Sequence, residues 1–294
     1  MGFRRPSYRG AEPAGVGSVV VVVDLDGAIG FVVAHGDAVE RARLSWLRAG
    51  TPPPPEILDL AEVGRTPDGG WPAVWAGDVT SVDATCFRLG ELDDLGALGR
   101  PAARTALDWL AARQQPDGCW EEDAALADTA PAWALPGDPE ARLYLTASAA
   151  FRLSVAGRDA RSAGPLDDRV GGVYAGVVHA AARALADALR PDGTWPSYLP
   201  VGWLSAAVLH LQQMYDEAAR IRAVLDERMR DMSSADTAWL AATLRRVDVP
   251  AAEWTLVAAR HRLASTQRTD GGWSSDDGHQ FDVHTTLAVI RAFR

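Results

Sequence analysis

The chain has 294 residues, of which 48% are hydrophobic, and this is enough to bury one large core or two small ones. Its formal net charge is −10 and it contains no run of Lys and Arg, so the composition argues against a nucleic-acid-binding protein. Its two cysteines, Cys86 and Cys119, are too few for a disulfide framework and lie outside any Cys-x-x-Cys pair, which favours a reducing environment.

The N-terminal region combines a tail with an apolar stretch. We expect residues 1–15 to form a disordered tail and residues 16–294 to form one domain, because no linker-like stretch divides them. Two arginines precede the apolar residues 14–23, and this arrangement superficially resembles a signal peptide. Asp24 and Asp26 end the stretch without a small-residue cleavage site, and no apolar run approaches the ~20 residues of a membrane span. The sequence therefore predicts a cytoplasmic protein.

A motif at the end of this stretch suggests a different chemistry. Residues 19–27 read Val-Val-Val-Val-Val-Asp-Leu-Asp-Gly and resemble the strand and Asp-x-Asp-Gly motif of haloacid-dehalogenase-like phosphatases. In that family Asp24 would be the nucleophile and Asp26 the acid/base of an α/β domain. No second strand-like run appears, and the rest of the chain reads as helix hairpins. We therefore expect residues 17–34 to form a helix, the first of an inner ring that the repeats described next imply.

Four segments share one pattern of turn residues followed by tryptophan. They read Thr66-Pro-Asp-Gly-Gly-Trp71, Gln115-Pro-Asp-Gly-Cys-Trp120, Arg190-Pro-Asp-Gly-Thr-Trp195 and Arg268-Thr-Asp-Gly-Gly-Trp273. Pro or Thr ends a helix, Asp-Gly supplies a turn with positive φ, and Trp anchors the turn as a large apolar side chain. Such a repeat is typical of an array of helix hairpins.

Amphipathic helices flank these turns. Residues 101–113 carry a stripe of Ala and Leu, with Pro101 at the first helical position. Ser81 can cap another helix whose apolar face contains Val82, Cys86, Leu89 and Leu92. The C-terminal third of the chain predicts four further helices, near residues 201–214, 217–231, 235–246 and 251–266.

Over residues 35–294 the turns and helices resemble the repeats of squalene–hopene and oxidosqualene cyclases and of the β subunits of protein prenyltransferases. The resemblance implies an all-α fold, a single (α/α)6 barrel in which six inner helices surround a cavity and six outer helices enclose them. It also implies that the four tryptophans are structural and pin the outer helices to one another.

The same resemblance points to an acid at the start of an inner helix. Proton-initiated (class II) terpene cyclases carry an Asp-x-Asp-Asp-Thr motif there, and its central Asp protonates an alkene or epoxide. The segment Ser81-Val82-Asp83-Ala84-Thr85 matches the central Asp and the Thr, but has Ser81 and Ala84 in place of the flanking acids. A carboxylic acid in a dry cavity stays protonated and can donate its proton, so Asp83 is the predicted general acid. The alternative is that Asp83 only complements the helix dipole.

Aromatic faces stabilise a passing carbocation through their quadrupoles. Five aromatic residues fall on or near predicted inner helices and are predicted to bind the substrate, although each could equally belong to the core: Phe87, Tyr144, Tyr198, Trp203 and Trp239.

Asp282 and His284 complete the predicted catalytic set. His284-Thr285 resembles the His-Thr pair that binds zinc in protein prenyltransferases, but the chain has no Asp-x-Cys partner motif, so no metal site is predicted. His284 would instead hydrogen-bond an acid across the cavity, as a His does in some cyclases. The Asp pairs of the chain lack the third acid of a DDxxD cluster, and Mg²⁺ is expected only if the substrate is a diphosphate.

The sequence thus favours a class II-like terpene cyclase that acts on a linear isoprenoid or prenyl diphosphate in an apolar barrel cavity. A non-catalytic barrel that binds an isoprenoid or a protein partner is the alternative, and a prenyltransferase β-subunit-like protein is a further one. No nucleic-acid partner and no transmembrane segment are expected, while peripheral membrane contact and oligomeric state stay open.

Overall fold

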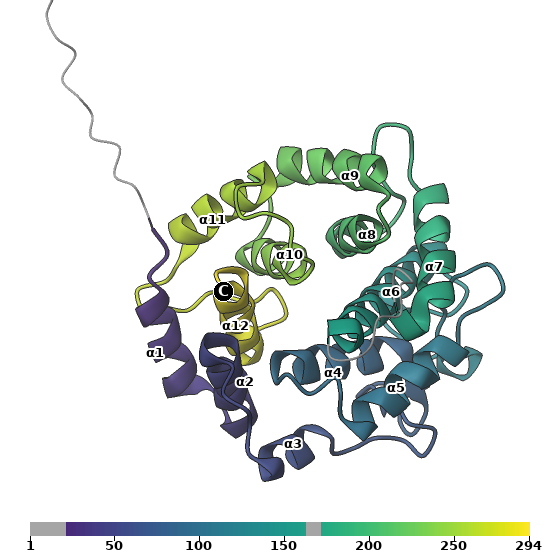
Figure 1. Cartoon of the computed structure of the whole chain (residues 1–294), viewed down its shortest axis with the longest axis horizontal. Helices are drawn as coiled ribbons and strands as arrows, with labels where there is room; N and C mark the ends of the chain where they lie inside the picture. The colour runs from purple at the N-terminus through teal and green to yellow at the C-terminus, as the bar shows by residue number, and fades with distance from the viewer. Residues whose placement is uncertain (1–21, 163–171) are drawn as a thin grey trace, which may run out of the picture.

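The computed structural model describes residues 22–162 and 172–294, in which the helices form two concentric rings (Figure 1). The inner ring consists of α2 (Ala38–Ala49), α4 (Val82–Asp94), α6 (Pro139–Ser162), α8 (Leu199–Leu211), α10 (Ser234–Arg246) and α12 (Asp282–Ala292). The outer ring consists of α1 (Leu25–His35), α3 (Pro55–Ala61), α5 (Pro101–Ala112), α7 (Ala175–Asp187), α9 (Tyr215–Arg228) and α11 (Trp254–Thr266). The predicted all-α (α/α)6 barrel is confirmed.

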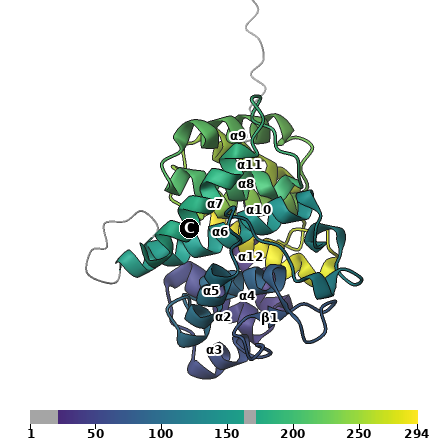
Figure 2. The same ribbon diagram turned by 90° about the vertical axis from the view of Figure 1, so that its right-hand side faces the viewer.

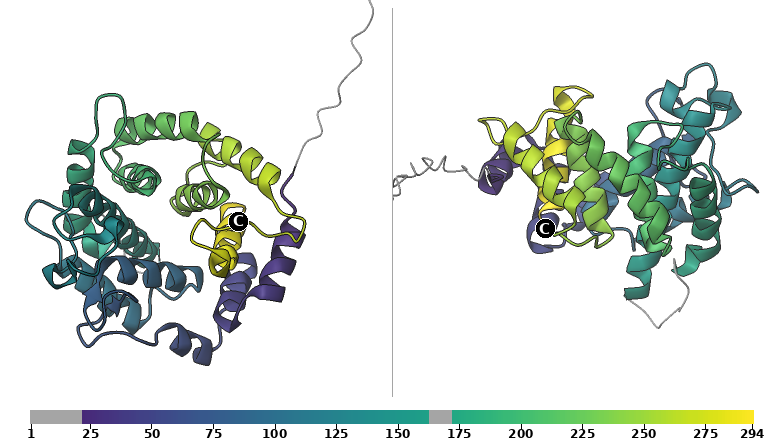
Figure 3. Two further views of the ribbon diagram at one scale, coloured as in Figure 1. Left: turned by 180° about the vertical axis from the view of Figure 1, so that it is seen from behind. Right: turned by 90° about the horizontal axis from the view of Figure 1, so that it is seen from above.

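Neighbouring inner helices touch one another around the whole ring, and α12 closes it by contacting α2. Each inner helix packs against the outer helix that follows it, and α1 packs against α12. Because the chain alternates between the rings, the inner helices run in the same direction and their N-terminal ends lie together. Figure 2 shows the barrel from the side, with α3 and α9 at opposite edges, and Figure 3 shows the ring from behind and from above.

Short elements connect the rings. Strands β1 (Trp71–Pro72) and β2 (Thr80–Ser81) pair antiparallel, with Trp71 opposite Ser81, and lead directly into α4. Four single-turn helices complete the described elements: η1 (Ala124–Leu126), η2 (Ala132–Ala134), η3 (Gly172–Tyr174) and η4 (His279–Phe281).

The tryptophan turns join the two rings. Trp120 is fully buried, its indole N–H donates to the carbonyl of Leu110 in α5 at 2.8 Å, and its backbone N–H donates to Thr146 Oγ1 in α6 at 3.1 Å. Trp273 makes the equivalent pair of hydrogen bonds with α11 and α12. Each of these tryptophans therefore fastens the end of an outer helix to the next inner helix.

The glycines of the turns contact the following outer helix. Gly271 has a φ of 89° and lies so close to Gly27 of α1 that a side chain at position 271 would overlap the backbone there. Gly118 and Gly193 lie in the same way against the backbones of α7 and α9. The turns thus link consecutive outer helices, as the resemblance implies.

The predicted helix over residues 17–34 is present from Leu25 onward, but its assignment to the inner ring is wrong. Helix α1 begins only at Leu25, after Asp24 caps it by accepting a hydrogen bond from the Gly27 N–H, and it belongs to the outer ring. The first inner helix is α2, whose Arg43 is only 1% exposed because it forms ion pairs inside the barrel. A buried charged face does not follow the apolar pattern used for the prediction. Residues 1–15 and most of the valine run lie outside the described residues.

Candidate active site

Asp83 lies in the first turn of α4, which begins after the cap residue Ser81. The Ser81 hydroxyl accepts a hydrogen bond from the Ala84 N–H at 3.0 Å, as predicted for a cap. The Asp83 carboxyl group receives hydrogen bonds from the Tyr144 hydroxyl at 3.2 Å and from the Trp133 indole N–H at 3.1 Å. Burial raises the pKa of Asp83 and outweighs both hydrogen bonds, which act in the opposite direction. Burial thus favours the protonated form of this carboxyl group, whereas the two donors favour its carboxylate.

Glu122, which follows the second tryptophan turn, supports the start of α4. Its carboxylate accepts hydrogen bonds from the Ser81 hydroxyl at 2.8 Å and from the backbone N–H groups of Val82 and Asp83 at 2.8 and 2.9 Å. An anion at this place satisfies N–H groups that the helix itself leaves free and complements the helix dipole. Burial nevertheless raises the pKa of Glu122.

The predicted aromatic residues fall into separate groups. Tyr198 packs edge-on against Tyr144, with ring centroids 6.4 Å apart, so both lie on the side of Asp83. Phe87 is partly exposed and its ring lies 5.7 Å from that of His284. Trp203 is buried in the core of α8, and Trp239 is half-buried among core residues.

His284 faces α2. Its Nδ1 lies 3.0 Å from Nη1 of Arg43, which can only donate, and its Nε2 lies 3.4 Å from Oε1 of Glu40. The structure therefore places an acid beside the imidazole. Burial and the charge of Arg43 lower the pKa of His284 to about 4, so the ring is neutral at pH 7.

The carboxylate of Asp282 faces a loop. It accepts hydrogen bonds from the Arg268 guanidinium at 2.5 Å and from the Ser275 N–H at 2.8 Å, and lies 3.2 Å from His279 Nδ1. Burial would raise the pKa of Asp282, but these partners outweigh it and hold the pKa below its usual value. This carboxylate is suited to fixing the last tryptophan turn. Its predicted catalytic role stays a prediction, as does that of His284.

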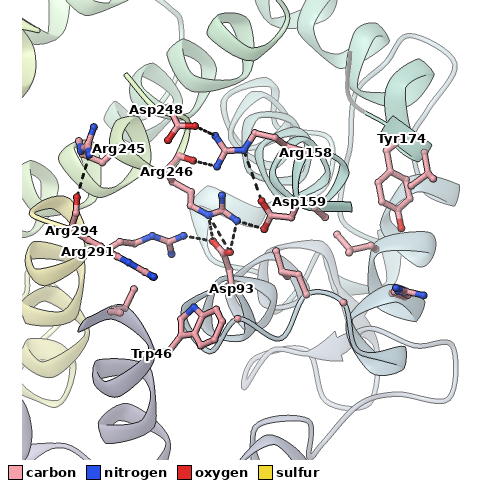
Figure 4. Close-up of a pocket in the computed structure, with 18 of the residues that line it drawn as sticks. Trp46, Asp93, Arg158, Asp159, Tyr174, Arg245, Arg246, Asp248, Arg291 and Arg294 are labelled. Carbon is pink, nitrogen blue, oxygen red and sulfur yellow. Dashed lines mark hydrogen bonds and ion pairs between the residues drawn. The ribbon is translucent and has the colours of Figure 1, made fainter. Parts of the chain in front are cut away.

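A network of ion pairs crosses the barrel near the C-terminal ends of the inner helices (Figure 4). Asp93 pairs with Arg246 and Arg291, while Asp94 pairs with Arg43 at 2.8 Å and with Arg291. Burial alone would raise the pKa of Asp93, but the charges of Arg291 and Arg246 lower it far below its usual value. We call this set the ion-pair belt, and it consists of Arg43, Asp93, Asp94, Asp159, Arg246 and Arg291.

A pocket of about 940 Å³ adjoins the belt at this end of the barrel. Its lining comes from the C-terminal parts of α2, α4, α6, α10 and α12, from α5 and the loop before it, and from η3. None of the residues predicted to form the site lines it. Because the belt joins α2, α4, α6, α10 and α12, paired charges lie among the inner helices at this end of the barrel.

The sequence reasoning missed Glu122, Trp133 and the arginines of the belt. Nothing in the local sequence shows that Glu122 caps a helix some 40 residues earlier. The thiol of Cys86 is buried, which raises its pKa, and in the described part of the chain no group of three or more His, Cys, Asp and Glu side chains could hold a metal ion.

Within residues 22–162 and 172–294, no helix has both the length and the apolar character that crossing a bilayer requires.

The comparisons with known proteins identify fold relatives only. No protein-family model and no curated protein matches the sequence. Among solved structures, a protein from Actinoplanes superposes with a TM-score of 0.59 at 19% identity, over 92% of this chain and 97% of that one.

The type II terpene cyclase MstE from Scytonema also matches. Its apo form superposes with a TM-score of 0.58 at 16% identity, over 91% of this chain and 96% of that one. A complex of an MstE variant with its product, merosterolic acid A, gives 0.54 at 17% identity over 91% and 85%. This chain therefore has the fold of a type II terpene cyclase.

Proposed function

We propose that this protein is a class II-like terpene cyclase that acts on a linear isoprenoid, with Asp83 as the general acid. The observation that carries the proposal is the environment of this carboxyl group. Asp83 lies at the start of an inner helix, burial raises its pKa, and Tyr144 and Trp133 both contact it. Protonation of an alkene requires a carboxyl group that carries its proton, and a raised pKa favours this form.

The two donors suit the step in which the proton leaves. The O–H bond of the acid breaks, the alkene π electrons form a new C–H bond, and the carboxyl group becomes a carboxylate. Both hydrogen bonds to Asp83 are long in the resting protein and strengthen as negative charge develops. Tyr144 contacts Asp83 directly and packs against Tyr198, and the faces of these rings and of Phe87, which lies one turn along α4, would stabilise the carbocation.

The substrate class rests on the fold relatives. One MstE variant was solved in complex with geranylgeranyl dihydroxybenzoate, at a TM-score of 0.53 and 17% identity over 91% of this chain and 85% of that one. We therefore assign an isoprenoid chain as the substrate class. We place the protein in the cytoplasm, at most in peripheral contact with a membrane. Mg²⁺ would be required only for a diphosphate, whose charge it would neutralise.

The test is product analysis by gas chromatography–mass spectrometry. Wild-type protein, Asp83→Asn and the control Asp78→Asn are incubated with geranyl, farnesyl and geranylgeranyl diphosphates and with squalene, with Mg²⁺. Asp78 is exposed in the loop before β2, so its variant makes the same chemical change away from α4. A cyclised product that wild type and Asp78→Asn form and Asp83→Asn does not is the expected result. A product that persists in Asp83→Asn contradicts the proposal.

Binding without turnover is the second candidate. Ser81 and Ala84 replace the flanking acids of the cyclase motif, and both donors to Asp83 stabilise its ionised form. This candidate predicts that an isoprenoid raises the melting temperature without being consumed, equally in wild type and Asp83→Asn. A prenyltransferase-like role would instead require bound zinc in the purified protein, which metal analysis measures directly.

A further inference from the structure

The pocket beyond the ion-pair belt has a surplus of positive charge. Six arginines and four aspartates line it, although the whole chain carries a net charge of −10. Its aspartates already have partners: Asp93 and Asp159 pair within the belt, Asp248 accepts from Arg158 at 2.9 Å, and Asp108 accepts from the Tyr174 hydroxyl at 3.0 Å.

Three of the lining arginines have no side-chain carboxylate partner among the described residues. Arg245 donates only to main-chain oxygens of Val249 and Arg294, and its Nε is buried without an acceptor. The guanidinium groups of Arg294 and Arg104 form no hydrogen bond or ion pair within the described part of the chain, and Arg104 is exposed. Cations are therefore available on two walls of the pocket.

The wall formed by α5 is independently suited to an anion. Arg104 lies in the first turn of this helix, where the helix dipole opposes a positive charge, and no side chain caps the helix N-terminus. Gly99, which immediately precedes the N-cap residue Arg100, and Arg104 both line the pocket, so the pocket adjoins the uncapped end of α5. Backbone N–H groups at a helix N-terminus together with an arginine are a recurrent way of binding phosphate.

The remaining lining is apolar. Trp46 and Leu47 of α2, Leu98 and Leu107 on either side of the start of α5, and Val173 before α7 all contribute to it. A ligand that fits this pocket thus combines an anionic group with an apolar body, and the volume is that of a small-molecule site.

We propose that this pocket is a second ligand site, separate from Asp83, that binds an organic phosphate with an apolar body. A phosphate suits it better than a carboxylate because its charge and its three terminal oxygens can engage arginines and helix N–H groups together. The ion-pair belt lies between the pocket and the end of the barrel that carries Asp83. Ligand binding in the pocket therefore does not require Asp83.

Isothermal titration calorimetry with three probes of equal alkyl chain length tests the proposal. Octyl phosphate, nonanoate and octanol share an eight-carbon alkyl chain and differ in the head group. We expect octyl phosphate to bind more tightly than nonanoate, octanol or inorganic phosphate, with an affinity that falls as salt is added. Tighter binding of nonanoate would replace the phosphate assignment with a carboxylate, and no binding of octyl phosphate at millimolar concentration would overturn the site.

The variants locate the binding. Arg104→Gln and Arg294→Gln are each expected to weaken octyl phosphate binding by about tenfold, the loss of one charge-assisted contact. Arg183→Gln, on the exposed face of α7, makes the same change elsewhere and is expected to have no effect. Asp83→Asn should also bind normally, so this site can be confirmed even if the cyclase proposal fails. Equal binding by all four variants would place the ligand elsewhere and refute the proposal.

Discussion

The side-chain amide of Gln267 forms two hydrogen bonds with the backbone of Asp24. Its Oε1 accepts from the Asp24 N–H at 2.8 Å and its Nε2 donates to the Asp24 carbonyl at 2.7 Å. The two residues are 243 positions apart and connect the end of α11 to the start of α1. These two hydrogen bonds join the last outer helix to the first, which are not consecutive in the chain, and so close the outer ring.

Removing this pair should loosen the closure. Gln267→Ala removes these two hydrogen bonds and a third, from Nε2 to the Gly271 carbonyl at 2.9 Å. It is expected to lower the free energy of unfolding by about 3 kcal/mol, since each hydrogen bond contributes about 1 kcal/mol. Chemical denaturation measures this free energy. Gln280→Ala, which loses only a local bond to Asp277, is the control, and an equal effect of the two changes would show that the closure contributes nothing of its own.

The contact between Gly271 and Gly27 gives a second prediction. Gly271→Ala should cost about 2–4 kcal/mol, because the added methyl group strains a backbone with φ of 89° and overlaps α1. Gly64→Ala has a similar φ of 84° but no atom near the new methyl group, so it should cost only about 1–2 kcal/mol. Equal losses in thermal or urea unfolding would contradict the role assigned to the close approach.

The ion-pair belt should be costly to break. Arg291→Gln leaves Asp93 and Asp94 buried with one arginine fewer, and the expected loss of stability is about 3 kcal/mol. Arg190→Gln, at an exposed position, should cost less than about 0.5 kcal/mol. If Arg291→Gln lowers the free energy of unfolding as little as the control does, water replaces the ion pairs of Arg291 without loss of stability.

His284 makes stability depend on pH. Its pKa falls from 6.5 when unfolded to about 4 when folded, so between these values the unfolded chain binds the extra proton. Stability should therefore fall by up to about 3 kcal/mol as the pH drops from 6.5 to 4. In His284→Gln this part of the pH dependence should disappear, whereas His261→Gln, at an exposed histidine, should retain it. Unfolding curves at several pH values provide the comparison.

The proposed acid should also leave a signature in the pH–rate profile. Because burial raises the pKa of Asp83, the proton is present at low pH and is lost as the pH rises through the raised value. Cyclisation is therefore expected to decline on the alkaline side. Trp133→Phe removes one donor to the carboxylate, so the decline should move to higher pH. An unchanged pH–rate profile in a correctly folded Trp133→Phe variant would show that Trp133 does not influence the pKa of Asp83.

The turns and helix caps could be predicted because their signals are local. Asp-Gly before Trp specifies a turn wherever it occurs, and Ser81 caps α4 through a hydrogen bond to a residue three positions away. The four helices of the C-terminal third likewise lie close to their predicted ranges.

The interior of the barrel could not be predicted in the same way. Arg43, Arg246 and Arg291 look like ordinary surface residues of amphipathic helices, and only the ring brings them to Asp93 and Asp94. Glu122 and Trp133 reach α4 from a long connection, so their hydrogen bonds depend on tertiary structure alone. The same lack of a local signal explains why α2 was not recognised as an inner helix.

The ion-pair belt lies along α4 at a fixed distance from Asp83. Glu91, which lies within 3.5 Å of the belt residue Arg43, follows Asp83 by eight residues along α4, a rise of about 12 Å. If the proposed substrate extends along α4 from Asp83, it meets paired charges at that depth, and separating them would be unfavourable. The belt would then limit the length of the isoprenoid chain that fits without folding back on itself.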